Sequence, residues 1–286
     1  MIGVLRMAKY ILSEGRIKRF ELHLREEERS EHTIGKYVRD IRAFRSFLAG
    51  RELSKELVLA YKLYLSKKYK PASVNSMLAA LKSFFTFCGW PELRVKSLKV
   101  QKRMFAEPER VLTAEEYNRL LVAAKSRQKE QLCLLMQTIC ATGIRVSELS
   151  FITVEAARLG RAEVSSKGKQ RTVFMTPKLK ILLLSYAKRR GITTGHVFVS
   201  RNGIPLNRHR IWAEMKKLCQ EAEVDAAKVF PHNLRHLFAR TFYSIEKDLS
   251  RLADILGHSN IDTTRIYTME CGDNHMRIMK KMPLLL

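Results

Sequence analysis

The sequence has few acidic side chains to set against its many basic ones. Among its 286 residues, Lys and Arg number 53 whereas Asp and Glu number only 28, which gives a formal net charge of +25 and an isoelectric point near 10.1. Residues 1–100 carry 21 basic and 10 acidic side chains, and residues 101–286 carry 32 and 18. This balance favours a polyanionic partner, first of all nucleic acid, because neutralised phosphates release counterions on binding. A generally basic surface, as in a ribosomal or membrane-peripheral protein, is the alternative.

Cysteine pairs, long apolar runs and a nucleotide-binding loop are also missing. The five cysteines are scattered and form no C-x-x-C pair, so we expect neither a disulfide framework nor a zinc ribbon. No apolar run approaches about 18 residues and the first ten residues lack the core of a signal peptide, so we expect a cytoplasmic protein. The G-x-x-x-x-G-K-[ST] loop is absent, so ATP is not expected as a cofactor.

Residues 17–88 show helical periodicity throughout, within a first domain that we place at 1–100. Ser30 and Ser54 are candidate N-caps, and Pro71 can begin a fourth helix. The pattern predicts a domain built as a bundle of about four helices. The periodicity stops at residues 101–111, a basic stretch that contains a proline, and we place a linker there.

Residues 112–286 predict a second domain of mixed structure. It begins helically after Thr113, where T-A-E-E matches a capping box. Short strand-like runs from Phe151 to Met175, broken by Gly160 and by the basic tip at 167–169, predict a small antiparallel hairpin. Later helix-start signals stand at Pro177, Asn207, Pro231 and Ser259-Asn260. The fold class is therefore mainly α with a small antiparallel β-sheet in the C-terminal domain, that is, α+β.

The segment A-T-G-I-R-V-S-E-L at 141–149 puts an arginine beside a helix end. A glycine ends one helix and Arg145 opens the next segment near a helix N-terminus, a position suited to binding phosphate. Taken alone, this pattern more often means a turn followed by a solvated or salt-bridged arginine.

The segment P-H-N-L-R-H begins a helix at Pro231. His232 and Arg235 lie three residues apart, so they share one face and can address one ligand, and His236 adds a third polar group. His232 and His236 also have the spacing of a zinc helix. We expect no metal, because the fixed charge of Arg235 opposes a cation and no general-base glutamate lies between the histidines.

A third segment, L-G-H-S-N-I-D-T-T-R-I-Y, ends at Tyr267. A glycine turn presents His258, and a new helix carries Tyr267 nine residues later. Taken alone, such a histidine is usually a capping or core group and such a tyrosine usually packs.

Together these residue types suit phosphoryl transfer without a metal. A phosphodiester gathers negative charge on its non-bridging oxygens in the pentacoordinate state, and arginine side chains stabilise that charge. A tyrosine hydroxyl can attack in line and store the bond energy as a phosphotyrosine ester. The leaving sugar oxygen needs a proton, for which a lysine of the predicted hairpin is the candidate, Lys167 before Lys169.

The three segments, in this order, resemble the tyrosine recombinase (phage integrase) family, in particular its Xer type and the archaeal branch of that type. The family's A-T-G-x-R-x-S-E-L, H-x-L-R-H and L-G-H…Y boxes match residues 141–149, 232–236 and 256–267. The hairpin departs from the common G-K-G-x-K-x-R, because this chain has S-K-G-K-Q-R at 166–171. By resemblance the catalytic residues are Arg145, Lys167, His232, Arg235, His258 and the nucleophile Tyr267, which forms a 3′-phosphotyrosyl bond.

The resemblance also implies an architecture and a biological role. A helical core-binding (SAM-like) domain at 1–100 and a catalytic domain at 112–286 would form a two-domain, C-shaped clamp on double-stranded DNA. A tail helix at about 273–286 would dock on a neighbouring protomer, or else on its own domain. Four protomers would synapse two dif-like sites and resolve chromosome dimers. The alternatives are an integrase of a mobile element, a type IB topoisomerase-like enzyme and a DNA-binding protein that has lost the reaction.

Overall fold

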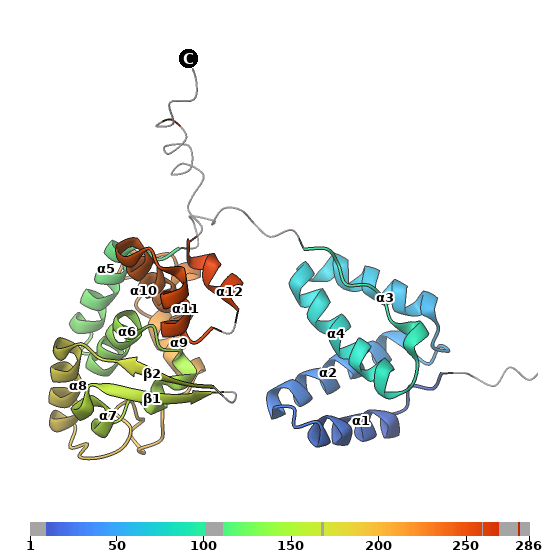
Figure 1. Cartoon of the computed structure of the whole chain (residues 1–286), viewed down its shortest axis with the longest axis horizontal. Coiled ribbons are helices and arrows are strands. Elements are labelled where there is room, and N and C mark those ends of the chain that lie inside the picture. The colour runs from blue at the N-terminus through green and yellow to red at the C-terminus, as the bar shows by residue number, and fades with distance from the viewer. Residues whose placement is uncertain (1–9, 101–110, 167–168, 259, 269–279, 281–286) are drawn as a thin grey trace, which may run out of the picture. The chain divides into compact units, whose positions relative to one another are not determined.

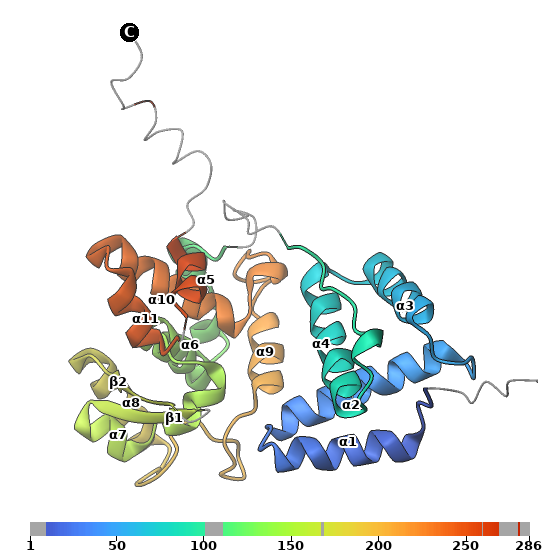
Figure 2. The ribbon, with the colours of Figure 1, turned by 45° about the vertical axis from the view of Figure 1, so that its right-hand side comes forward.

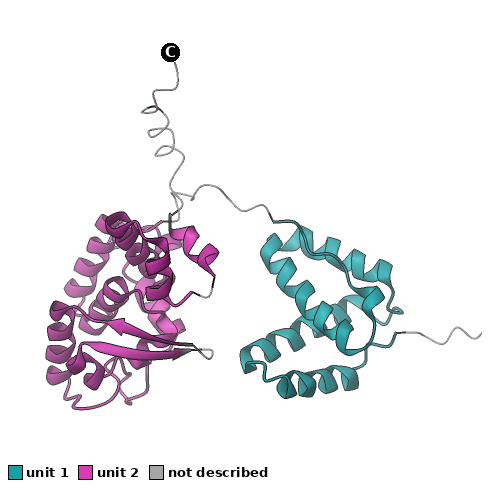
Figure 3. Ribbon diagram, viewed as in Figure 1, with its two compact units in different colours: residues 1–102 teal, residues 103–286 magenta. Residues whose placement is uncertain are grey.

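The structure is a computed structural model in which two compact units, residues 1–102 and 103–286, divide the chain (Figures 1 and 3). It describes residues 10–100, 111–166, 169–258, 260–268 and 280. Within these residues, no helix is both long and apolar enough to cross a membrane. The predicted linker at 101–111 and the predicted tail helix at 273–286 lie outside the described residues, except for residues 111 and 280.

The described residues of unit 1 form a bundle of four helices (Figure 2). Its elements are α1 (Glu14–Glu26), α2 (Glu31–Leu48), α3 (Lys55–Lys68), α4 (Pro71–Phe87) and the short 3-10 helix η1 (Pro91–Leu93). The predicted helix starts are confirmed, because the hydroxyls of Ser30 and Ser54 accept N–H groups in the first turns of α2 and α3, and Pro71 begins α4. The four helices bury their apolar stripes in one core, in which Phe20, Phe44 and Phe84 are fully buried.

Unit 2 combines helices with one two-stranded sheet, so the predicted α+β fold class is confirmed. Its elements are α5 (Ala114–Ser126), α6 (Glu130–Thr142), η3 (Val146–Phe151), α7 (Val154–Leu159), β1 (Arg161–Ser166), β2 (Lys169–Phe174), α8 (Pro177–Arg189), α9 (Arg208–Lys216), η4 (Ala226–Lys228), α10 (Pro231–Glu246), α11 (Leu249–Leu256), α12 (Ile261–Arg265) and η5 (Ile266–Thr268). Helix α6 contacts α5, α8, α9 and α10, and its side chains form the middle of the core. The capping box at Thr113 and the starts at Pro177, Asn207, Pro231 and Asn260 are confirmed.

The predicted hairpin is confirmed over part of its length. Strands β1 and β2 pair antiparallel, with Arg161 opposite Phe174 and Ser166 opposite Lys169. The tip at 167–168, which includes the proposed Lys167, lies outside the described residues.

The prediction of strand-like runs was wrong from Phe151 to Leu159. These residues end η3 and then form helix α7. Local capping explains the difference, because the hydroxyl of Thr153 accepts the N–H of Ala156 at 3.1 Å and Gly160 ends the helix with φ +74°. A six-residue helix between two caps is too short for its apolar spacing to be told from alternation.

Candidate active site

A pocket of about 370 Å³ in unit 2 gathers five of the six predicted catalytic residues. Its lining includes Arg145, His232, Arg235, His236, His258 and Tyr267. They come from the start of η3, the first two turns of α10, the turn after α11, and η5, so the pocket joins segments that lie far apart in the sequence. The sixth predicted residue, Lys167, lies outside the described residues.

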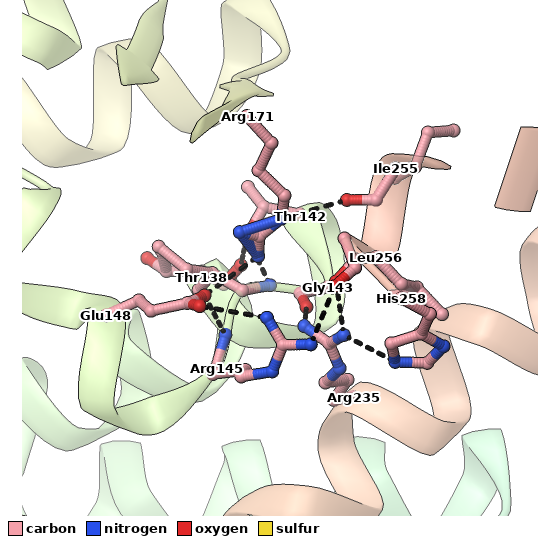
Figure 4. A network of polar contacts seen from close by, with 12 residues as sticks. Thr138, Thr142, Gly143, Arg145, Glu148, Arg171, Arg235, Ile255, Leu256 and His258 are labelled. Atoms are coloured by element: carbon pink, nitrogen blue, oxygen red, sulfur yellow. Dashed lines mark hydrogen bonds and ion pairs between the residues drawn. The ribbon is translucent and has the colours of Figure 1, made fainter. Parts of the chain in front are cut away.

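The C-terminal end of α11 holds three arginine side chains (Figure 4). Each of three successive carbonyls accepts one guanidinium hydrogen bond: Ile255 O from Arg171 Nε at 3.2 Å, Leu256 O from Arg235 Nη2 at 2.6 Å, and Gly257 O from Arg145 Nη2 at 3.1 Å. The last carbonyls of a helix have no partner within the helix and carry its partial negative charge. One helix end therefore orients guanidinium groups from β2, α10 and the start of η3.

Glu148 is the buried anion of this network. Its side chain is only 2% exposed. Oε1 accepts a hydrogen bond from Arg145 Nη1 at 2.9 Å, and Oε2 accepts one from Arg171 Nη2 at 2.8 Å and one from the backbone N of Arg145 at 3.1 Å. One carboxylate beside three guanidinium groups leaves an excess of positive charge, which suits an anionic ligand such as a phosphodiester.

Arg235 is the most buried of the arginines, at 2% exposure. It also donates to Gly143 O and, through Nη2, to His258 Nε2 at 3.0 Å. Burial and, secondarily, Arg145 lower the pKa of Arg235 to about 10, while the nearby Tyr267 opposes the shift. The side chain stays charged at neutral pH, although its charge is desolvated and repelled, and an anion in the pocket would offset both costs.

His258 is a neutral imidazole with a defined tautomer. An arginine can only donate, so His258 Nε2 accepts from Arg235 and Nδ1 carries the proton. Nδ1 donates to the hydroxyl of the fully buried Thr264 at 2.8 Å. Burial and the neighbouring positive charges, Arg235 foremost, lower the pKa of His258 to about 4.

Two further histidines line the pocket, and one of them, His236, contacts the ring of Tyr267. The ring of His236 lies 4.5 Å, centroid to centroid, from the rings of both His232 and Tyr267. Burial and His232 lower the pKa of His236 to about 4, and burial and Arg235 lower the pKa of His232. The Tyr267 ring is 5% exposed and packs in an apolar cluster of α10 and α11. The tyrosine therefore has the packing role expected of it in isolation and also borders the pocket.

Three residues of the network were given no role by the sequence: Glu148, Arg171 and Thr264. For Arg171 a signal existed, because alternation along β2 puts it on the same face as the buried Val173. A charged residue on a buried face needs a partner. Across the described residues, no group of three or more His, Cys, Asp or Glu side chains could hold a metal ion.

Comparison with known proteins gives the class. The sequence matches the phage integrase family at residues 110–271 and the phage integrase N-terminal SAM-like domain at 17–90. The chain belongs to the phage integrase family, whose members are the tyrosine recombinases. The predicted enzyme class, a site-specific DNA recombinase with a tyrosine nucleophile, is thereby confirmed.

Individual relatives are of the Xer type, as predicted. Tyrosine recombinase XerA of Thermococcus kodakarensis is 30% identical over 280 residues, which cover 94% of this chain and 95% of that protein. The solved XerH recombinase bound to difH substrate, a pre-cleavage complex, has a TM-score of 0.69 at 19% identity and covers 95% of this chain and 85% of its own. A lambda integrase tetramer bound to a Holliday junction has a TM-score of 0.72 at 19% identity, with coverages of 91% and 78%. At such identity these two structures show the shared fold.

Proposed function

We propose that this recombinase cleaves and rejoins DNA at a dif-like site through a 3′-phosphotyrosyl bond to Tyr267, and so resolves chromosome dimers. The observation that carries the proposal is the pocket itself, in which Tyr267 meets two arginines and three imidazoles whose pKa values are lowered. A nucleophilic hydroxyl next to guanidinium groups is the arrangement that in-line attack on a phosphodiester requires.

In this proposal Arg145 and Arg235 bind the non-bridging oxygens of the scissile phosphate. Support comes from their hydrogen bonds to backbone carbonyls, which fix both guanidinium groups before DNA arrives. Groups that are already oriented need no reorganisation when charge develops in the transition state. Each oxyanion-stabilising group of this kind typically contributes about 10²–10³ in rate.

In this proposal the imidazoles of His232 and His258 donate or accept protons and hydrogen bonds. The lowered pKa of His232 keeps its ring neutral near pH 7, so that it can accept the proton of the Tyr267 hydroxyl or donate to the phosphate. His258 uses Nε2 to hold Arg235, and so contributes through the guanidinium group that it orients.

Lys167 is the proposed general acid for the leaving 5′-oxygen, with Lys169 as the alternative. The proposal rests on the resemblance to the family and on the antiparallel pairing of β1 and β2. A lysine near this hairpin tip lies within four residues of Arg171, which joins the arginine network.

The proposed partner is double-stranded DNA, bound by both units and synapsed by a tetramer. The basic excess of both parts of the chain supports this, as do the DNA complexes of the structural relatives. Docking of the tail between protomers belongs to the same proposal. The enzyme would act in the cytoplasm, on the nucleoid, and would need neither metal nor nucleotide cofactor.

Covalent capture tests the chemistry. The protein is incubated with fragmented genomic DNA of its source organism in EDTA, denatured, and separated from free DNA. Wild type should retain DNA through a peptide that contains Tyr267, and Tyr267→Phe should retain none. Tyr243→Phe, which changes a partly buried tyrosine of the same apolar cluster, is the matched control and should behave as wild type. Undiminished capture by Tyr267→Phe would reject this nucleophile.

Sequencing the captured DNA tests the biological role. A single chromosomal site near the replication terminus is expected of chromosome-dimer resolution. Fragments from the ends of a mobile element would instead assign the enzyme to integration. DNA binding without any covalent capture would favour a protein that has lost the reaction.

A further inference from the structure

We infer that Arg171 is a positioning residue of this recombinase, which holds Arg145 and the end of α11 in the geometry that acts on the phosphate. The inference rests on the proposed function and adds a residue that the proposal does not use. Arg171 is not among the side chains that line the pocket. It lies one layer away, on strand β2, and reaches the site through two of its partners (Figure 4).

The first partner is Glu148, which Arg171 shares with Arg145. The two carboxylate oxygens are divided between the guanidinium groups, with Arg145 Nη1 on Oε1 and Arg171 Nη2 on Oε2. Without Arg171, a carboxylate that is 2% exposed would lose one of the two guanidinium groups with which it forms ion pairs within the described residues. The Glu148 carboxylate would then bind Arg145 alone and draw that side chain from its present orientation, because a buried charge is costly unless it is paired.

The second partner is the end of α11. Arg171 Nε donates to Ile255 O at 3.2 Å, and its aliphatic part packs on Gly257. A Cβ at Gly257 would lie 2.6 Å from Arg171 Cδ, so the arginine fills the space that a side chain would take. The neighbouring carbonyls of the same turn hold Arg145 and Arg235, and His258 follows directly. Arg171 therefore fixes the turn on which the other two arginines depend.

Three variants test the inference. Arg171→Met removes the hydrogen bonds that Arg171 donates to Glu148 and to Ile255 O. Arg171→Lys keeps the charge but cannot make the Nε and Nη2 hydrogen bonds together. The control, Arg161→Met, makes the same change at an exposed position at the start of β1. All are compared with wild type for DNA affinity, thermal unfolding and single-turnover formation of the Tyr267 adduct on a nicked duplex that carries the captured site.

We expect Arg171→Met to slow adduct formation about 10–100-fold, the usual cost of losing an outer partner of a reacting group. DNA affinity should stay within about threefold of wild type, because a residue outside the pocket does not contact the phosphate. Arg171→Lys should recover part of the rate, and Arg161→Met should match wild type in adduct formation. If Arg171→Met does not fold, Arg171→Lys alone tests the inference. The inference then requires that Arg171→Lys form the adduct more slowly than wild type while its DNA affinity is retained.

Two further measurements separate positioning from other roles. Glu148→Gln should already lose the part of the effect that Arg171 exerts through Glu148, so the double variant should be faster than the product of the two single losses predicts, whereas fully additive losses would overturn the proposed coupling. A substrate with sulfur in place of the leaving 5′-oxygen needs no general acid, because a thiolate leaves without a proton. Arg171→Met should remain slow on it. Full rescue by sulfur would overturn the inference, since it would mean that Arg171 serves only the hairpin lysine.

Failure of the inference can be told from failure of the proposed function. If wild type forms the adduct and Arg171→Met forms it at the same rate, the inference alone is overturned. If wild type captures no DNA covalently, the proposed function falls and the inference falls with it.

Discussion

Replacing His258 with glutamine should reduce the loss of unfolding free energy that unit 2 shows as the pH falls. A glutamine can accept from Arg235 through its oxygen and donate to Thr264 through its amide, but it does not titrate. The folded protein lowers the pKa of His258 from 6.5 to about 4. Because the unfolded chain binds this proton more tightly than the folded one, wild type loses stability as the pH falls from about 6.5 toward about 4.

The size of the effect follows from the two pKa values. At about pH 7.5 both states hold the imidazole neutral, and the group contributes almost nothing to the pH dependence. At about pH 5 the unfolded chain is mostly protonated here and the folded protein is not. The difference amounts to roughly 2 kcal/mol of lost unfolding free energy, by linkage. His236, whose pKa is lowered to about 4 as well, is present in both proteins, and because His258 is the smallest of the causes of that shift, most of the His236 contribution cancels in the comparison.

The assay is urea unfolding of unit 2 at these two pH values. The chain has two tryptophans, Trp90 in unit 1 and Trp212 in unit 2. In a Trp90→Phe background, fluorescence follows Trp212 alone. His258→Gln should lose about 2 kcal/mol less than its parent between about pH 7.5 and about pH 5. An equal loss in both proteins would refute the neutral imidazole and with it the strong positive field assigned to the arginine network.

Three other changes give separate tests. Gly143→Ala should destabilise unit 2 by about 2–4 kcal/mol, because φ is +64° and the new Cβ would lie 2.4 Å from a ring carbon of Phe238; urea unfolding with a loss under about 1 kcal/mol would contradict this. Thr264→Val should slow single-turnover cleavage by about tenfold or more while Thr264→Ser keeps the rate, because the hydroxyl of residue 264 accepts the Nδ1 proton of His258 and so orients the imidazole toward Arg235. Of Lys167→Ala and Lys169→Ala, one should slow cleavage by about 10²–10⁴ and be rescued by a sulfur leaving group; two equally slow variants would argue against a single general acid.

Local patterns in the sequence were sufficient for much of the fold. Caps such as Ser30, Ser54 and Thr113 act within one helical turn, so their effect is visible in a few neighbouring residues. Helix α7 was missed because its length leaves room for fewer than two full turns, and over that length helical and strand patterns of apolar residues coincide.

The polar network of the site could be predicted only in part. The sequence boxes that contain Arg145, His232 and Arg235 can be recognised from their residue types. The groups that orient these side chains cannot. Arg145 meets Gly257 across 112 residues, and Arg171 meets Ile255 across 84. Both acceptors are backbone carbonyls, which every residue has, so no choice of side chain marks them in the sequence.

The positive charge of the arginine network contributes to two features of the site. Burial, together with the guanidinium groups around one carboxylate, makes a proton on His258 unfavourable, and the guanidinium groups make negative charge in the pocket favourable. A neutral imidazole accepts the hydrogen bond that steadies Arg235, which a protonated one could not do. The helix end contributes partial charges that cannot titrate, so it holds the arginines together without neutralising them as further carboxylates would. The network thus keeps its attraction for phosphate while each arginine has a fixed partner.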